Sequence, residues 1–393
     1  MLVVILNWKE GENDPFTAFN EALAGHFEAY GKEVRILEIT DPAWIQQLTA
    51  LDLQSGVELV FTFQGIGSAP LVGHPPRNIW EALGTPLVCF HGDHPCHMPD
   101  NHRLDIPNAM HLYSTREFNA YANRHFRRRV PGTHAHSPMM SRDIPLGRRS
   151  GDSFIFAKNI VHPRQMEKVW REELSPESGQ ILLEIAEMLR AEMRKSPWVD
   201  PHAVVDAYLA TQTPPPYDPR VNAEGFHALH SQMDLYSRNL KSVQVVETLH
   251  DVPLQIHGRG WEAFAAAGNP KHQFFRGRPM AYSQSLYYSN YGILDVTPSM
   301  TGMHDRTLRA LRNETPFLSS AHLPGFLPDM KPFGPLFFGF AGTDLREKAE
   351  AVMADPEGHA ERSRAFSMEY QRRVDPMDFV RTLDLLGRSL DRR

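Results

Sequence analysis

The sequence predicts an α/β protein built from two Rossmann-like domains that face each other across a cleft, with a helical elaboration in the second domain. Short apolar runs typical of parallel strands alternate with helical segments along the chain. A polar segment with Pro and Gly at residues 142–153 is typical of a linker. With 393 residues, the chain can form two separate cores. We therefore expect domains at 1–145 and 151–365, followed by terminal helices at 366–393 that can pack back on the first domain.

The first domain begins with a continuous apolar run at residues 2–6, as in a parallel strand covered on both faces. Similar runs predict further strands at 33–39, 58–64, 86–92 and 109–114. The segments between and after them predict helices at 15–30, 42–51, 78–83 and 121–126.

The second domain begins with the strand at 154–158 and is then unusually helical. Prolines at 213–220 interrupt the helices, because proline lacks the backbone N–H and clashes with the preceding turn. The helices are expected at 163–195, 201–211 and 222–249. A strand within 253–258, a short helix from Tyr282, a strand at 292–296, a helix from about Met303 and a strand at 316–319 complete the prediction.

The most informative segment is the loop TPSMTGMHD, which leads into the helix carrying His304 and Arg306. The first backbone N–H groups of a helix are unpaired, and the helix dipole there favours anions. Arg306 adds a planar guanidinium that can bind two phosphate oxygens at once. The segment therefore predicts a diphosphate-binding site.

This segment resembles the donor site of GT-B glycosyltransferases, and specifically the CgeB-like (spore maturation protein B-like) group. The pattern consists of Asp295, Pro298, Gly302, His304, Asp305 and Arg306. The strand and Gly-Xaa-Gly-Trp turn at 252–261 and the charged terminal helices resemble the same group, so that the similarity extends over roughly residues 151–390. The sequence departs from the wider GT-B pattern at Arg309, where many GT-B enzymes carry a Glu that binds the nucleotide ribose.

The resemblance implies metal-independent transfer of a sugar from a nucleotide-diphosphate sugar, most commonly a UDP-sugar, with no other cofactor. Arg306 would stabilise the leaving diphosphate, and the glycines would let the backbone approach the nucleotide. Lys158 and Asn159 are added because ligands of such sheets gather at the carboxyl ends of strands. The donor-binding set is Lys158, Asn159, Gly258, Gly260, Trp261, Thr297, Ser299, Gly302, His304 and Asp305.

The resemblance also implies an acceptor side in the first domain. An Asp-Xaa-Pro turn follows one of its strands, here Asp93-His94-Pro95, and Asp or His suits proton abstraction near neutral pH. Asp93 and His94 are therefore catalytic candidates, although Asp93 could equally cap a turn. Asn7, Gly65 and Gly67 end neighbouring strands and are candidates for lining the acceptor side. The acceptor itself is open: a protein, a glycan, a small molecule or a modified nucleic-acid base.

Two other functions stay open. The stretch 89–102 is rich in His and Cys, which are preferred zinc ligands, and could serve a metal-dependent hydrolase or lyase. Its spacing does not match a standard zinc signature, so no metal ligand is assigned. The chain could also be a non-catalytic nucleotide-sugar binding subunit.

Composition excludes several classes of protein. The net charge of −6 argues against a dominant nucleic-acid-binding role. Two cysteines suggest a reducing compartment, and no apolar run reaches the ~20 residues that span a bilayer, so a cytoplasmic location is expected. The chain has no Walker A loop, GxGxxG fingerprint, Gly-Xaa-Ser-Xaa-Gly elbow or Asp-Xaa-Asp motif. Kinase, NAD-dependent dehydrogenase and α/β-hydrolase functions therefore lack their main support.

Overall fold

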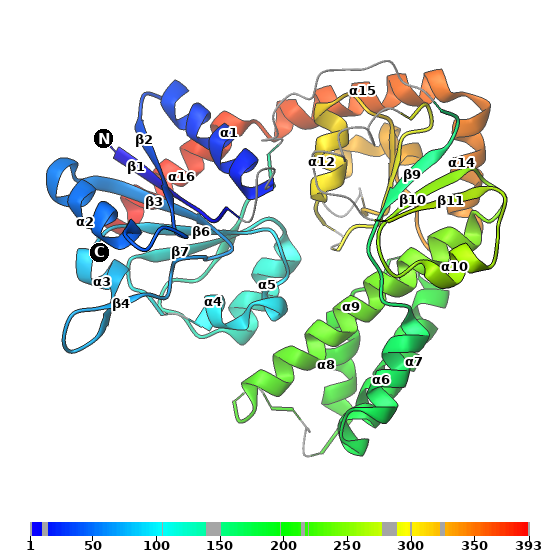
Figure 1. Cartoon of the computed structure of the whole chain (residues 1–393), viewed down its shortest axis with the longest axis horizontal. Coiled ribbons are helices and arrows are strands. Elements are labelled where there is room, and N and C mark those ends of the chain that lie inside the picture. The colour runs from blue at the N-terminus through cyan, green and yellow to red at the C-terminus, as the bar shows by residue number, and fades with distance from the viewer. Residues whose placement is uncertain are drawn as a thin grey trace. The chain divides into compact units, whose positions relative to one another are not determined.

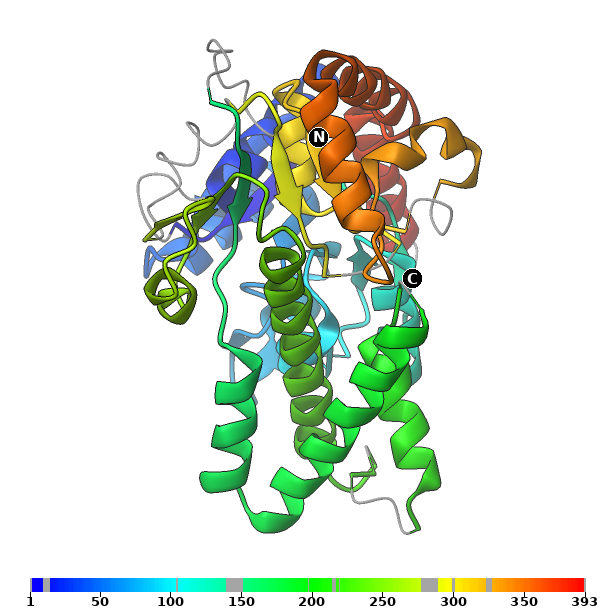
Figure 2. The same cartoon turned by 90° about the vertical axis from the view of Figure 1, so that its right-hand side faces the viewer.

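The computed structural model describes residues 2–9, 15–103, 105–138, 151–196, 198–213, 217–218, 220–276, 289–298, 301–322 and 327–391. It divides into two compact units. Unit 1 comprises Met1–Asp143 and Glu369–Arg393, and unit 2 comprises Ile144–Met368. Each unit contains a parallel sheet covered by helices, which confirms the predicted pair of Rossmann-like domains (Figures 1 and 2). Within the described residues, no helix has the length and apolar character needed to cross a membrane.

The sheet of unit 1 has the strand order β2-β1-β3-β6-β7-β8, and all neighbouring strands are parallel. Its strands are β1 (Leu2–Asn7), β2 (Glu33–Glu38), β3 (Val57–Phe63), β6 (Leu87–His91), β7 (Ala109–Tyr113) and β8 (Thr133–His134). Its helices are α1 (Pro15–Ala29), α2 (Trp44–Ser55), α3 (Ile79–Leu83), η1 (Pro95–His97), α4 (Pro99–Arg103), α5 (Arg116–His125) and α16 (Pro376–Asp391). A short antiparallel hairpin, β4 (Leu71–Val72) and β5 (Arg77–Asn78), was not predicted.

Two apolar layers cover the faces of this sheet. Phe27 of α1 and Leu383 of α16 belong to one layer, so a helix from the end of the chain completes the core of the first domain (Figure 1). Leu48 of α2 and Trp80 of α3 belong to the layer on the other face. All six residues of β1 are buried, as expected for a strand with helices on both sides.

The sheet of unit 2 is also parallel, with the order β11-β10-β9-β12-β13. Its strands are β9 (Phe154–Ala157), β10 (Leu254–His257), β11 (His272–Phe275), β12 (Ile293–Asp295) and β13 (Phe317–Ser319). Its helices are α6 (Pro163–Glu172), α7 (Pro176–Lys195), α8 (Pro201–Thr211), α9 (Ala223–Thr248), α10 (Glu262–Ala266), α12 (Asp305–Arg312), η3 (Pro328–Leu336) and α14 (Asp344–Ala354), while α15 (Pro356–Arg373) leads the chain back to unit 1. Helices α6 to α9 form the predicted helical elaboration (Figure 2).

The single helix predicted at 163–195 is wrong, because the structure has two helices, α6 and α7. Ser175 caps α7 by accepting a hydrogen bond from the backbone N–H of Ser178 at 3.2 Å. Pro176 occupies the first position of α7, where its missing N–H does no harm. The helix expected from Tyr282 lies outside the described residues.

Candidate functional site

The candidate site of unit 2 lies where β9 and β12 end. In the order β11-β10-β9-β12-β13, the strands that follow β9 in the chain, β10 and β11, lie on one side of it. The later strands β12 and β13 lie on its other side, so the strand order reverses between β9 and β12. The carboxyl ends of such a pair of strands are the usual ligand site of a doubly wound sheet. Lys158 and Asn159 follow β9, Thr297 follows β12, and α12 begins at Asp305.

His304 is held between two carboxylates at this point. Its Nδ1 lies 2.9 Å from Asp295 Oδ1, and its Nε2 lies 2.9 Å from Asp305 Oδ1. Asp295 is only 1% exposed and also accepts a hydrogen bond from the Thr307 hydroxyl at 2.7 Å. Only an imidazole protonated on both nitrogens can donate to both carboxylates.

The pKa values of His304 and Asp295 agree with a charged histidine. Burial alone would lower the pKa of His304, but the carboxylates of Asp295 and Asp305 outweigh burial and raise it. Burial would raise the pKa of Asp295, but the imidazolium and Arg306 hold it below its usual range. The result is a buried ion pair that fixes the start of α12 against the end of β12.

Three cationic side chains meet beside this pair. Burial lowers the pKa of Lys158 to about 8, and the nearby charges of Arg306 and Arg238 add to that effect. Arg306 Nη1 is 3.4 Å from His304 Nδ1. Arg238 comes from α9 and pairs with Asp234 at 2.5 Å. A cluster of cations of this kind can attract an anionic group.

Sequence reasoning missed Arg238, because it lies in the middle of a long helix, far from the loop motif. The only sequence signal was its i,i+4 spacing from Asp234, which is common on ordinary helix surfaces. The neighbouring Asn239 accepts a hydrogen bond from the backbone of Val161 at 3.2 Å. This contact ties α9 to the segment that follows Lys158.

The glycine turn after β10 packs closely against the chain that follows β9. A Cβ on Gly260 would lie 1.9 Å from the carbonyl oxygen of Ile160, and one on Gly258 would lie 2.1 Å from that of Lys158. Trp261 is buried, and its Nε1–H donates to the Lys158 carbonyl at 2.6 Å. The glycines were expected to let backbone approach a nucleotide; in the structure they let backbone approach backbone.

The remaining donor-side candidates are placed as follows. Asn159 accepts a hydrogen bond from the backbone of Arg259 at 2.9 Å. Thr297 is 4% exposed and donates its backbone N–H to Ser320 Oγ at 2.9 Å, which joins the ends of β12 and β13. Gly302 is buried just before α12. Ser299 lies outside the described residues.

The candidates for lining an acceptor side, Asn7, Gly65 and Gly67, lie at the ends of β1 and β3. Asn7 is fully buried; it donates to Glu38 at 2.7 Å and accepts from Asn20 at 2.8 Å. Gly65 and Gly67 adopt positive φ angles of 67° and 82° in the turn after β3. In the order β2-β1-β3-β6, the crevice between β1 and β3 is the switch point of this sheet.

The two catalytic candidates of unit 1 have different surroundings. Asp93 is half-buried, and one oxygen accepts a hydrogen bond from Gln64 Nε2 at 2.8 Å. His94 is 3% exposed; its Nδ1 accepts from the Cys96 backbone at 3.3 Å and caps η1. Its ring packs edge-on against Phe118 and Tyr121. Asp93 is therefore the more accessible of the two.

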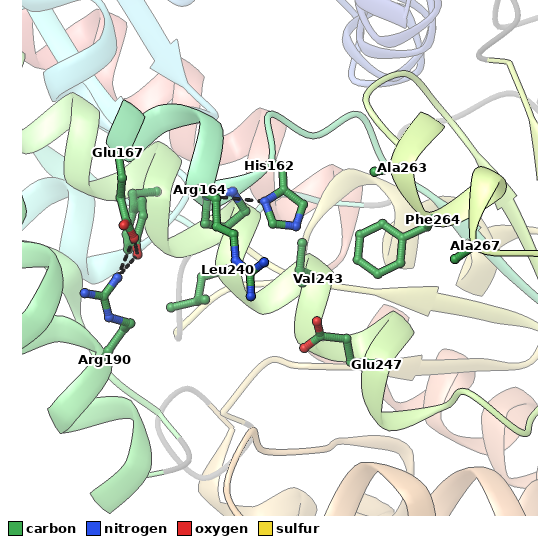
Figure 3. Close-up of a pocket in the computed structure, with 12 residues that line it drawn as sticks. His162, Arg164, Glu167, Arg190, Leu240, Val243, Glu247, Ala263, Phe264 and Ala267 are labelled. Atoms are coloured by element: carbon green, nitrogen blue, oxygen red, sulfur yellow. Dashed lines mark hydrogen bonds and ion pairs between the residues drawn. The ribbon is translucent and has the colours of Figure 1, made fainter. Parts of the chain in front are cut away.

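A pocket of about 590 Å³ lies among α6, α7, α9 and α10 in unit 2 (Figure 3). On one side Glu167 pairs with Arg190 at 2.5 Å and accepts from the Tyr236 hydroxyl at 2.6 Å. Phe264 and Val243 form an apolar part of the lining. The Glu167 network joins three helices of the elaboration, and no sequence motif pointed to it.

Comparisons with known proteins find similarity to solved structures only at low sequence identity. No protein-family model matches this sequence, and no curated protein matches it significantly. T4 phage β-glucosyltransferase shares 8% identity at a TM-score of 0.44, covering 95% of this chain and 100% of its own. Anabaena HepE, solved with UDP-glucose, shares 12% identity at a TM-score of 0.45, covering 100% of both chains. LpCGTa, solved with UDP, shares 11% identity at a TM-score of 0.37, covering 100% of this chain and 99% of its own. At such low identities and scores these similarities identify no site residue.

Proposed function

We propose that this chain is a GT-B glycosyltransferase of the CgeB-like group, which moves a sugar from a nucleotide-diphosphate sugar to an acceptor. The observation that carries the proposal is the group of Lys158, Arg238 and Arg306 beside the start of α12 at the β9/β12 switch point. A diphosphate would add negative charge beside Lys158 and Arg306, where the positive charges of Arg306 and Arg238 now act on the buried lysine. The donor motif from Asp295 to Arg306 supports the same class, and a UDP-sugar is the proposed donor.

The proposed chemistry is stabilisation of the leaving nucleoside diphosphate. As the bond to the sugar breaks, negative charge builds on the β-phosphate and must be neutralised in the transition state. Arg306 offers a two-pronged donor, α12 offers its N-terminal N–H groups, and Lys158 offers a further charge. The transfer is proposed to be metal-independent because these groups supply the compensating charge.

His304 has a specific part in this proposal. Its Nδ1–H is held by the buried Asp295, whereas its Nε2–H points to Asp305, whose side chain is 58% exposed. Rotation of the Asp305 side chain toward solvent would free Nε2–H for a phosphate oxygen, which would replace the carboxylate as the partner of the imidazolium. Asp295 would thus orient the imidazolium, and His304 would donate to the diphosphate.

The acceptor is assigned to unit 1, at the carboxyl ends of β1, β3 and β6. Asp93 is the proposed base because it is half-buried and its Gln64 contact leaves a carboxylate oxygen for a hydroxyl group. His94, which caps η1, is proposed to hold the turn that carries Asp93. Both cysteines are free thiols, in keeping with the proposed cytoplasmic location.

The test is UDP binding by calorimetry and UDP-sugar hydrolysis or transfer, compared between Arg306→Ala and Arg312→Ala. Both arginines lie on α12, but Arg312 is six residues further on, about 9 Å along the axis. We expect Arg306→Ala to lose at least about tenfold in UDP affinity, which is about 1.4 kcal/mol, and to lose turnover. Arg312→Ala should keep both.

Wild-type affinity in Arg306→Ala would refute the diphosphate assignment. UDP binding that depends on Arg306, with neither hydrolysis nor transfer to any acceptor, would instead identify a non-catalytic nucleotide-sugar binding subunit.

A further inference from the structure

A second group of reactive side chains lies in the sheet of unit 1. Cys89 and His91 are two residues apart on β6, so their side chains share one face of the strand. His111 is the register partner of Cys89 on the adjacent strand β7. The parallel pairing therefore brings a thiol and two imidazoles together, although the residues are up to 22 positions apart in the chain.

The three side chains are close to one another and shielded from solvent. His91 Nε2 is 2.9 Å from His111 Nδ1, and one ligand atom from each of the three residues lies within 4.8 Å of the other two. The exposed fractions of Cys89, His91 and His111 are 1%, 0% and 3%. Residues of this kind are seldom fully buried in a group without a specific contact.

The group is not satisfied by its own hydrogen bonds. Within the described part of the chain, His91 Nδ1 is buried without a hydrogen-bond partner. The 2.9 Å hydrogen bond between His91 Nε2 and His111 Nδ1 needs one of these nitrogens to accept, so at least one of the two imidazoles is neutral. A neutral imidazole with an unused nitrogen is the form of histidine that binds a metal.

We propose that Cys89, His91 and His111 bind one thiophilic d10 cation, Cu⁺ or Zn²⁺, in a structural site of unit 1. One thiolate and two imidazoles are the soft donor set that such ions prefer. On binding, the Cys89 thiol forms a sulfur–metal bond and releases its proton to solvent. Each imidazole binds through one bare nitrogen and keeps one N–H, so neither changes its charge.

To bind one ion, the three ligand atoms must shift modestly from their present positions. Bonds of about 2.0–2.1 Å to nitrogen and about 2.3 Å to sulfur place neighbouring ligand atoms roughly 3.3–3.8 Å apart. His91 Nε2 and His111 Nδ1, which hydrogen-bond at 2.9 Å, are closer than this, so the two rings must move apart or turn before both can bind one ion, while the ligand atoms of all three residues already lie within 4.8 Å of one another. Because all three residues are buried, the ion would enter during folding rather than from a surface cleft.

The surroundings favour a monovalent ion in a closed site. Arg128 brings a positive charge close to the group, because its Nη1 donates to the Tyr113 hydroxyl at 2.9 Å and the Tyr113 ring lies 5.0 Å from the His91 ring. Cu⁺ with one thiolate is neutral, whereas Zn²⁺ with one thiolate leaves a buried positive charge beside that guanidinium. The His102 ring lies 4.2 Å from the His91 ring and covers it, and its Nδ1 is 2.9 Å from the Tyr113 hydroxyl. An ion held there would stabilise the sheet without contacting a substrate.

The experiment uses the full chain, produced once with Zn²⁺ and once anaerobically with Cu⁺, and measures metal content and X-ray absorption. We expect one equivalent of one of these ions, with a first shell of one sulfur and two nitrogens. Cys89→Ala should bring the content close to zero, and Cys96→Ala, which removes the other buried free thiol, should leave it unchanged. UDP affinity should be the same in both variants, since the proposed ligands belong to unit 1.

The proposal is overturned if neither ion is retained in stoichiometric amount, or if Cys89→Ala retains it. In that case the group is a hydrogen-bonded histidine pair beside a buried thiol. Should Cys89→Ala not fold, the wild-type absorption spectrum decides alone: a shell without sulfur rejects Cys89 as a ligand. None of these outcomes bears on the diphosphate site of unit 2.

Discussion

At the scale of single residues, Lys158 of the proposed donor site is a buried lysine close to other positive charges. Burial is the main cause of its low pKa of about 8, and Arg306 and Arg238 lower it further, against the opposing effect of Asp295 and Asp305. A diphosphate would bring negative charge to this point and favour the protonated lysine. If a diphosphate binds here as proposed, it would offset the repulsion between Lys158 and the neighbouring arginines.

UDP affinity should consequently depend on pH through Lys158. Because the charged form binds phosphate and its pKa is lowered to about 8, the wild-type affinity should fall as pH rises from about 7 to about 9. Lys158→Arg should remove this part of the fall, because arginine stays charged. Lys158→Met should be weaker at pH 7 by about 1.5–3 kcal/mol, roughly ten- to a hundredfold.

Calorimetric titration of the three proteins at several pH values provides the measurement. His304, whose pKa is raised, also loses its charge as pH increases, but it does so in wild type and in Lys158→Arg alike. The difference between these two proteins therefore isolates Lys158. Equal pH dependence in both would contradict a phosphate contact by Lys158.

At the scale of elements, the turn after β10 determines the position of the chain after β9. Gly260 has a φ of 89°, and its missing side chain leaves room for the Ile160 carbonyl. Gly268 has a similar φ of 71° but has no atom within 4 Å of where a Cβ would be. Both glycines thus have a positive φ, but only Gly260 approaches another backbone atom closely.

This pair makes a matched test of whether the turn supports the site. Gly268→Ala should lose about 1–2 kcal/mol of stability, because alanine is strained at a positive φ, and should keep its UDP affinity. Gly260→Ala should be less stable than that and should also bind UDP more weakly, because Ile160 and the preceding Lys158 must shift. Denaturant unfolding and calorimetry measure the two effects. If both variants bind UDP as wild type does, the turn has no part in positioning the site.

The sequence predicted elements better than contacts. Apolar runs located β1, β3, β6 and β7 because a strand buried on both faces leaves a continuous signal. The 163–195 prediction failed because both α6 and α7 carry a helical pattern, and the break between them depends on a local cap. The hairpin of β4 and β5 has two residues per strand, which is too short for a periodicity to appear.

The candidate site was predictable only where it is local in sequence. Asp295, His304 and Arg306 lie on one segment, so their proximity followed from the motif. Arg238 joins them through the packing of α9, and His91 meets His111 through strand pairing, contacts that a single sequence does not encode as a pattern. The sequence predicted the turn of Gly258 and Gly260, but it did not predict the contact of this turn with the chain that follows β9.

At the scale of the whole molecule, unit 1 is discontinuous in sequence. Its core includes α16, whose residues Phe379, Val380 and Leu383 pack with the strands and α1. The buried Lys32 pairs with Asp384 at 2.7 Å and with Glu58 at 2.6 Å, which links the same helix to the sheet by charge. The first 138 residues therefore lack part of one face of their own domain.

Substitutions on α16 should accordingly destabilise the first domain. Leu383 is fully buried, and Leu383→Ala should cost about 2–5 kcal/mol through lost burial and the cavity left behind. Leu385, two residues further on, is 66% exposed, and Leu385→Ala should stay within about 0.5 kcal/mol of wild type.

Hydrogen exchange of the β1 and β3 amides reports on unit 1 directly and needs no two-state assumption for the whole chain. We expect these amides to exchange faster in Leu383→Ala only, with UDP affinity showing that unit 2 remains folded. Unchanged protection of β1 and β3 in Leu383→Ala would mean that α16 is not part of the cooperative core of unit 1, and that the strands and α1 form a stable domain without it.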